Sequence, residues 1–127
     1  MKKRIITDNA PGPIGPYSQG VDTGSLVFVS GQGGRNPETN LVAPDVVGQA
    51  EQVCKNVGAI LAAGGCTYDD VVKCLVFLKD MNDFAAVNEV YKKYFASGEV
   101  PPARTCIEAA RLPGDILVEI EAIAVKK

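Results

Sequence analysis

The sequence contains no histidine and no tryptophan. Histidine is the commonest metal ligand and the side chain that most often transfers protons near neutral pH. Its absence excludes Ser-His-Asp and Cys-His nucleophile systems, HExxH zinc sites and two-histidine ribonuclease mechanisms. Any reaction that this chain carries out must therefore use arginine, carboxylates, tyrosine, cysteine, amides or backbone groups.

Excess positive charge, paired cysteines and long apolar runs are also missing. The 13 Lys and Arg against 15 Asp and Glu give a net charge of −2, so nucleic acid is not an expected partner. The 4 cysteines form no CxxC pair, which predicts reduced thiols, no metal site and no disulfide framework. The basic N-terminus is followed by neither a signal sequence nor a membrane-length apolar run, so we expect a cytoplasmic protein without a membrane partner.

Length and patterning predict a single globular domain over residues 1–127. Glycine, proline and capping residues divide the apolar segments into strands and helices. The predicted strands cover 4–7, 26–30, 71–78, 103–110 and 116–125. The predicted helices run from Asp45 to the Gly64-Gly65 pair and from Asp83 to Gly98.

This order of elements predicts an α+β fold, with a single mixed β-sheet and two helices on one face. Two helices can cover only one face of such a sheet. To the other face we assign Arg104 and Glu119, on strands that are otherwise very apolar. A sheet of this kind commonly buries its second face against other subunits, so we expect an oligomer.

The segment Pro101-Pro102-Ala103-Arg104-Thr105-Cys106 places an arginine at the start of an apolar strand. Its planar guanidinium suits an anionic partner, either a carboxylate or a phosphate. A salt bridge to a nearby glutamate is an equally good interpretation. Cys106 points to the same face as Arg104. Without a histidine to activate it, we expect its thiol to be a buried apolar group rather than a nucleophile.

Two carboxylates, those of Glu119 and Glu121, lie on one face of the last predicted strand. Alternating polarity of this kind is typical of a solvated strand face. A glutamate that faces an arginine-bearing cavity has a second use, because it can accept a proton from water or pass one to a leaving amine.

Three further positions have a structural explanation when each is taken alone. Tyr17 ends a rigid Pro-Gly loop, and Asn88 lies within the second helix. Ser30 and Gly31 end a strand, where the backbone of the glycine is suited to offering an amide to a ligand.

Five segments together resemble the RidA (YjgF/YER/UK) family: IGPYSQG (14–20), FVSGQ (28–32), VFLKDMNDFAAVNEVYKKYF (76–95), PPARTCIEAARLP (101–113) and VEIEAIAV (118–125). They cover nearly the whole chain in the order and spacing of the family. The resemblance implies a chorismate-mutase-like α+β fold and a homotrimer with active sites between subunits. It also implies an enamine/imine deaminase that hydrolyses 2-iminobutanoate and 2-iminopropanoate to 2-oxo acids and ammonia, with neither cofactor nor metal.

The resemblance also implies roles for the candidate residues. Arg104 would hold the substrate carboxylate by a bidentate pair, and Glu119 would position and activate the attacking water. The backbone of Gly31 and Cys106 would bind the imine nitrogen, the water or the carboxylate. The cleft would be lined by Tyr17, Ser30 and Asn88.

Two other functions stay open from the sequence. The family also carries the label L-PSP endoribonuclease or translation inhibitor, but RNA cleavage here would depend on Arg, Glu and Tyr alone in an acidic chain. A non-catalytic or chaperone-like trimer that binds 2-oxo acids would use Arg104 equally well and leave Glu119 without a role. The family often has an Ile-Pro pair where this chain has Gly33-Gly34-Arg35, so the preferred imine is not predicted.

Overall fold

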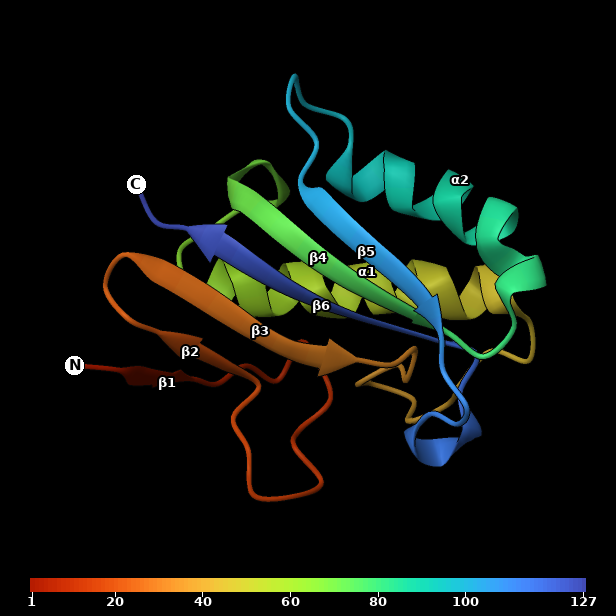
Figure 1. The fold of residues 1–127 in the computed structure, drawn as a ribbon. Helices are drawn as coiled ribbons and strands as arrows, with labels where there is room; N and C mark the ends of the chain where they lie inside the picture. The colour runs from red at the N-terminus through yellow and green to blue at the C-terminus, as the bar shows by residue number, and fades with distance from the viewer.

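The computed structural model describes residues 1–127 and contains one six-stranded sheet (Figure 1). In space the strands follow the order β1-β2-β3-β6-β4-β5. All neighbours are antiparallel except β4 and β5, which run parallel. The strands are β1 (Lys3–Ile5), β2 (Gly20–Asp22), β3 (Leu26–Gln32), β4 (Val71–Leu78), β5 (Ala103–Glu108) and β6 (Val118–Val125).

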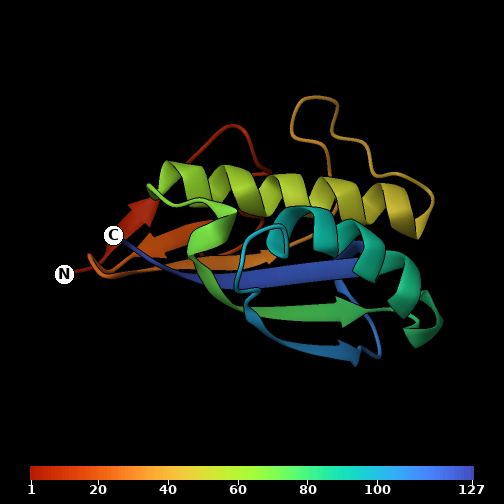
Figure 2. The same cartoon turned by 90° about the horizontal axis from the view of Figure 1, so that it is seen from above.

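Two helices, α1 (Val46–Ala63) and α2 (Phe84–Phe95), lie on the same face of the sheet. Figure 2 shows them together on one side, with no element on the other side of β3, β6, β4 and β5. Helix α2 connects the parallel strands β4 and β5, which cannot be joined by a tight turn. The α+β architecture predicted from the sequence, with two helices on one face of a mixed sheet, is therefore confirmed.

Capping side chains fix where the helical segments begin. The carboxylate of Asp45 accepts a hydrogen bond from the Gly48 backbone N–H at 3.2 Å, at the start of α1. Thr67 and Asp70 form a capping box at the short helical turn η1 (Tyr68–Asp70) that leads into β4. The predicted start of the first helix at Asp45 is thus confirmed.

The strands differ from the prediction at several ends. The sequence predicts no strand at Gly20–Asp22, yet this segment forms β2 by pairing with β1 and β3. Three residues are too few to show a periodicity, so only the pairing defines this strand. The first strand is found at Lys3–Ile5, and β5 ends at Glu108. The last strand starts at Val118 because the turn η3 (Pro113–Asp115) precedes it.

The hydrophobic core lies between the two helices and the sheet. Alternate residues of the central strands point into it, and every fourth or third residue of α1 faces them. Burial of one such aliphatic side chain stabilises the fold by about 1.5–3 kcal/mol. The largest fully buried aliphatic side chains are Ile60, Leu61, Leu78, Ile120, Val27, Val53, Val57, Val76, Val87 and Val118.

The opposite face of the sheet is apolar and has no element packed on it. Phe28, Ile107 and Val125 are 40%, 46% and 42% exposed, and Leu75 and Phe77 are half-buried. Phe77 lies directly opposite Ile107 in the β4–β5 pair, so the apolar side chains continue across the strands. Monomeric soluble proteins rarely expose a large contiguous apolar patch, which favours contacts between copies at this face.

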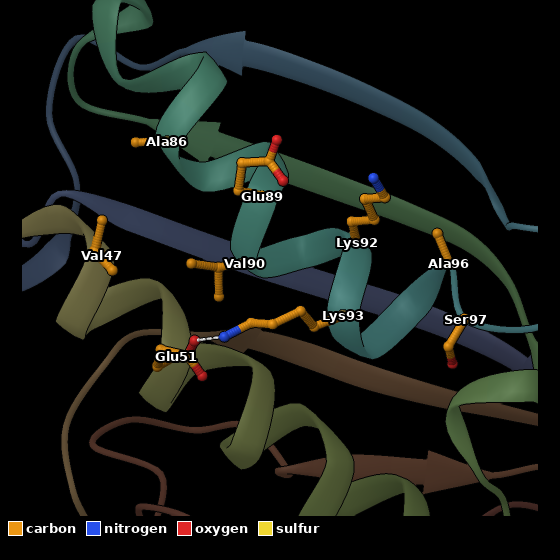
Figure 3. A pocket seen from close by; sticks show the side chains of 9 residues that line it. All are labelled: Val47, Glu51, Ala86, Glu89, Val90, Lys92, Lys93, Ala96 and Ser97. Atoms are coloured by element: carbon orange, nitrogen blue, oxygen red, sulfur yellow. Dashed lines mark hydrogen bonds and ion pairs between the residues drawn. The ribbon is translucent and has the colours of Figure 1, made fainter.

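Polar contacts also join the two helices (Figure 3). Lys93 of α2 forms an ion pair with Glu51 of α1, and the Tyr94 hydroxyl donates to the other oxygen of Glu51 at 2.5 Å. These hydrogen bonds lower the pKa of the Glu51 carboxyl. A groove of about 680 Å³ lies between the helices here, and none of the predicted site residues lines it.

Neither helix has an apolar stretch long enough to cross a membrane.

Candidate active site

Arg104 lies on β5, and its side chain meets helix α2. Its Nη1 donates a hydrogen bond to Oδ1 of Asn88 at 2.8 Å. The guanidinium carbon lies 4.7 Å from the centre of the Tyr91 ring and 5.5 Å from that of Phe84. Because Phe84, Asn88 and Tyr91 are spaced by four and three residues, one face of α2 surrounds the guanidinium.

No carboxylate of the chain pairs with Arg104. The four ion pairs are Lys93–Glu51, Arg111–Asp115, Lys126–Asp22 and Lys127–Asp70. Within one chain, the alternative of a salt bridge to a nearby glutamate is therefore wrong. Arginine has five N–H donors, and the hydrogen bond to Asn88 uses one of them. The remaining N–H donors of the guanidinium are free to bind an anion from outside the chain.

Cys106 lies two residues beyond Arg104 on the same face of β5, as predicted, and packs half-buried against the core. Burial raises the pKa of its thiol, and this outweighs the lowering effect of Arg104. A thiol of this kind is protonated at neutral pH and is a poor nucleophile. Because β5 is an edge strand, one side of its backbone is unpaired within the chain and can bind a ligand.

A cavity of about 890 Å³ opens beside the end of β3 and the start of β6. It brings together Tyr17, Ser30, Gly31 and Glu119, which come from a loop and two strands. Glu121, the second carboxylate of β6, also lines it. The predicted position of both carboxylates on one face of the last strand is confirmed, since Ile120 between them is buried.

Glu119 lies directly against Gly31. A Cβ atom at position 31 would collide with Oε2 of Glu119, so no residue with a side chain fits without moving the carboxylate. A bulge between Val29 and Gln32 interrupts the pairing of β3 with β6 at this point. Next to the bulge, the Ser30 hydroxyl donates to the Ser18 carbonyl at 2.6 Å, which fixes its side chain.

Burial raises the pKa of the Glu119 carboxyl, and the neighbouring Glu121 carboxylate raises it further. In the β4–β6 pair, Glu119 lies opposite Phe77 and Glu121 lies opposite Leu75. These apolar neighbours keep water away from the Glu119 carboxylate, which disfavours its charged form. A carboxyl group with a raised pKa accepts and releases a proton more readily near neutral pH than an ordinary glutamate.

Tyr17 is 48% exposed at the rim of the cavity. Its hydroxyl oxygen accepts a hydrogen bond from the Ile14 N–H at 3.3 Å. The loop that carries it is held by Gln19, whose side-chain amide is buried in the loop. This amide accepts one hydrogen bond and donates three, and its backbone partners are Thr7, Ala10 and Pro11. Gln19 therefore fixes the loop that carries Tyr17.

Asn56 performs the same task for the loop after β3. It is fully buried on α1, and its Nδ2 donates to the carbonyl oxygens of Gly33 and Arg35, both at 2.9 Å. Neither Gln19 nor Asn56 is among the residues predicted from the sequence. For Asn56 a signal existed, because a polar residue next to Val57 falls inside the apolar stripe of the predicted helix. Gln19 has no comparable signal, since its loop shows no periodicity.

Replacing Asn56 by Leu is expected to lower the free energy of unfolding by about 1–3 kcal/mol, because two loop carbonyls lose their donor. Urea denaturation measures this change. The matched control is Lys55→Leu at the neighbouring exposed position, for which we expect a change within about 0.5 kcal/mol. An Asn56→Leu variant as stable as the control would show that these hydrogen bonds do not hold the loop.

Arg104 and Glu119 lie on opposite faces of the sheet. On β4, Cys74 lies opposite Arg104 and Phe77 lies opposite Glu119. Cys74 and Phe77 are three residues apart, so their side chains point to different faces. The prediction that both Arg104 and Glu119 occupy the uncovered face is therefore wrong for Arg104. Alternation along β5 alone cannot tell which of its faces meets the helices.

The candidate residues thus form two half-sites that one chain does not bring together. The arginine half-site consists of Arg104, Asn88 and Cys106, at β5 and α2. The glutamate half-site is the cavity with Tyr17, Ser30, Gly31 and Glu119. Nowhere in the chain do three or more Cys, Asp or Glu side chains form a group that could hold a metal ion.

This fold and these half-sites define a small α+β protein with a free arginine at a sheet edge and a carboxylate in a separate cavity. The family model described as Endoribonuclease L-PSP matches residues 7–126. The chain therefore belongs to this family, which is the RidA (YjgF/YER/UK) family that the sequence resembles.

Individual relatives are similar over their full length. A protein of Salmonella typhimurium named 2-iminobutanoate/2-iminopropanoate deaminase is 53% identical over 128 residues, which cover 100% of both chains. The solved YjgF gene product of Escherichia coli has a TM-score of 0.94 and 51% identity, covering 98% of this chain and 99% of that one. E. coli TdcF, solved with bound serine, has a TM-score of 0.94 and 50% identity with the same coverage. The chain is accordingly an enzyme.

Proposed function

We propose that this chain is a cofactor-independent deaminase that hydrolyses 2-iminobutanoate and 2-iminopropanoate to 2-oxo acids and ammonia. The observation that carries the proposal is an arginine without a counter-ion, Arg104, together with a proton acceptor of raised pKa, Glu119. A 2-imino acid offers both matching groups, a carboxylate for the arginine and an electrophilic carbon for water. The names of relatives more than 50% identical support the same substrates.

The active site of this proposal lies between two copies of the chain. The arginine half-site of one copy meets the glutamate half-site of the next, because a single chain holds them on opposite faces of its sheet. A contact between two different patches is head-to-tail, and it forms a ring when the rotation from one copy to the next closes. We take this ring to be the homotrimer that the family resemblance implies, and it also gives the apolar sheet face a place to be buried.

In the first step, the Arg104 guanidinium holds the substrate carboxylate by a bidentate pair, with Asn88 fixing the guanidinium. Backbone groups of Gly31 and Cys106 orient the imine nitrogen, the carboxylate and the attacking water. Tyr17 and Ser30 line the cleft. The imine carbon is already electrophilic, so orientation and one modest base are sufficient for the reaction.

Water then adds to the imine carbon. Its oxygen bonds to that carbon, Glu119 takes the proton, and the electron pair of the C=N bond moves to nitrogen. Glu119 passes this proton to the nitrogen, which gives a neutral carbinolamine. Transfer of the remaining hydroxyl proton to nitrogen, again through Glu119, breaks the C–N bond. Ammonia leaves, and the C=O bond of the 2-oxo acid forms.

A coupled assay tests the proposal. A threonine dehydratase generates 2-iminobutanoate, and the release of 2-oxobutanoate is followed with and without this protein. We expect the protein to accelerate release over the spontaneous reaction in buffer, and no acceleration would overturn the proposed function. The matched control is Arg111→Ala, which removes an exposed arginine outside both half-sites and is expected to keep wild-type activity.

The endoribonuclease alternative is disfavoured by the charges of the site. The cavity holds the carboxyl groups of Glu119 and Glu121, and the chain carries a net charge of −2, so both repel a phosphate backbone. Purified protein that cleaves RNA faster than its Arg104→Ala variant would support the alternative.

We place the deaminase in the cytoplasm, a reducing compartment that suits its free cysteines.

A further inference from the structure

We propose that Tyr91 is a positioning residue that holds the Arg104 guanidinium ready for the substrate carboxylate. The inference rests on the proposed function, and it concerns a residue that lies in neither half-site as defined above. Tyr91 is 6% exposed on α2, and its ring centre lies 4.7 Å from the guanidinium carbon of Arg104. This is the closer of the two rings beside Arg104, since that of Phe84 lies 5.5 Å away.

The Tyr91 ring offsets the charge of Arg104 without occupying its hydrogen-bond donors. A half-buried arginine needs something to offset the loss of water, and a carboxylate would do this at the cost of occupying its N–H donors. No carboxylate pairs with Arg104. The negative face of an aromatic ring stabilises the cation without accepting a directional hydrogen bond from its fork. Tyr91 therefore stabilises the charge and leaves the fork free for substrate.

The groups around Tyr91 are neutral. The Tyr91 hydroxyl is buried without a hydrogen-bond acceptor or donor at normal geometry. Burial raises the pKa of this phenol far above neutrality, and it raises the pKa of the neighbouring Cys74 thiol to about 11. Neither group becomes an anion at neutral pH. Within the chain, therefore, no anion occupies the position beside Arg104 that the substrate carboxylate would take.

Aromatic packing makes the position of Tyr91 rigid. The Tyr91 ring stacks on Phe95 with centroids 4.8 Å apart, and Phe95 meets Tyr68 edge to face at 5.2 Å. The Tyr68 hydroxyl donates to the Cys54 carbonyl of α1 at 2.8 Å. A continuous row of aromatic rings thus connects the first helix to Arg104. This row fixes the ring plane of Tyr91, and the ring plane in turn limits the rotation of the guanidinium.

Steady-state kinetics test this role. Tyr91→Leu removes the ring, and we expect KM for 2-iminobutanoate to rise roughly tenfold, as loss of a partly desolvated cation–π contact predicts. The kcat value should stay within about twofold, because the contact is the same in ground and transition states. Tyr91→Phe keeps the ring and should restore KM to within about twofold of wild type. A loss in Tyr91→Phe as large as in Tyr91→Leu would overturn the role of the ring.

Val90→Ala is the matched control, since Val90 is a buried residue of the same helix that lines the groove between the helices and lies outside the aromatic row. It is expected to lower stability while leaving KM nearly unchanged. If Val90→Ala raised KM as much as Tyr91→Leu, the effect would come from helix packing, and the proposal would be wrong.

A readout without catalysis separates this inference from the proposed function. The heteronuclear NOE of the Arg104 Nε–Hε group, assigned with an Arg104→Lys variant, reports how rigid the guanidinium is. We expect a high value in wild type and Tyr91→Phe, and a clear drop in Tyr91→Leu. An equally rigid guanidinium in Tyr91→Leu would overturn the positioning role. If the wild type lacked deaminase activity, the proposed function alone would fail, and the NOE would still decide the role of Tyr91.

Discussion

Replacing Glu119 by Gln is expected to lower kcat for imine hydrolysis by about 10²–10³-fold, while KM changes little. The amide keeps the size of the carboxylate and fits against Gly31, so the cavity should be unchanged. It cannot accept a proton from water, and this function is needed mainly in the transition state. The control is Glu121→Gln, one position further along the same strand face, for which we expect kcat near the wild-type value at neutral pH.

The pH dependence of the wild type should report the same group. The pKa of Glu119 is raised by burial and by Glu121. A base must be deprotonated, so activity falls as the pH drops through this raised pKa, above the ordinary range of glutamate. Glu121→Gln removes one of the two causes and should shift the acid limb to lower pH. A wild-type rate that shows no acid limb in this range, or a Glu119→Gln variant with wild-type kcat, would remove Glu119 from the mechanism.

The second large effect concerns a mixture of two inactive variants. Arg104→Ala removes the carboxylate clamp and is expected to lower kcat/KM by about 10²–10³-fold. Glu119→Gln disables the other half-site. If each site takes Arg104 from one chain and Glu119 from the next, random mixed rings contain sites in which both residues are wild type. With equal amounts of the two variants, about a quarter of all sites regain both residues.

Mixing after joint unfolding and refolding, or co-expression with two different tags, provides this test. Recovery of about a quarter of the wild-type activity is the expected result, with each variant refolded alone as the control. No recovery, in samples whose mixed assembly is verified by sequential purification on both tags, would show that the two half-sites do not meet between chains. Light scattering on the wild type adds a direct check, because a monomer mass would exclude the ring.

Sequence analysis predicted the elements that have a clear period. The apolar stripe of α1 and the alternation in β6 located both elements, since each is long enough to repeat. The three-residue β2 has no such repeat and was missed. The contact between Gly31 and Glu119 depends on a register and a bulge that follow from tertiary structure, and only the family resemblance suggested that both residues serve one site.

The face occupied by Arg104 shows a second limit. Alternation along β5 correctly placed Arg104 and Cys106 together. Which face that is depends on where α2 lies, and α2 places Phe84, Asn88 and Tyr91 beside Arg104. The buried amides of Gln19 and Asn56 are a third example, because their partners are backbone groups of loops. Residues that hold a site in place are harder to predict than those that face a substrate.

The missing counter-ion of Arg104 has a consequence for the assembly itself. In most proteins a buried arginine forms an ion pair with an acidic residue of the same chain, so its charge is balanced without a ligand. Here no residue of the same chain supplies the opposite charge. Under the proposed arrangement, a bound carboxylate touches groups of two copies at once, and it therefore stabilises the contact between them by mass action. The ring with substrate bound is then more stable against dissociation than the empty ring. The substrate is in this sense a part of the quaternary structure.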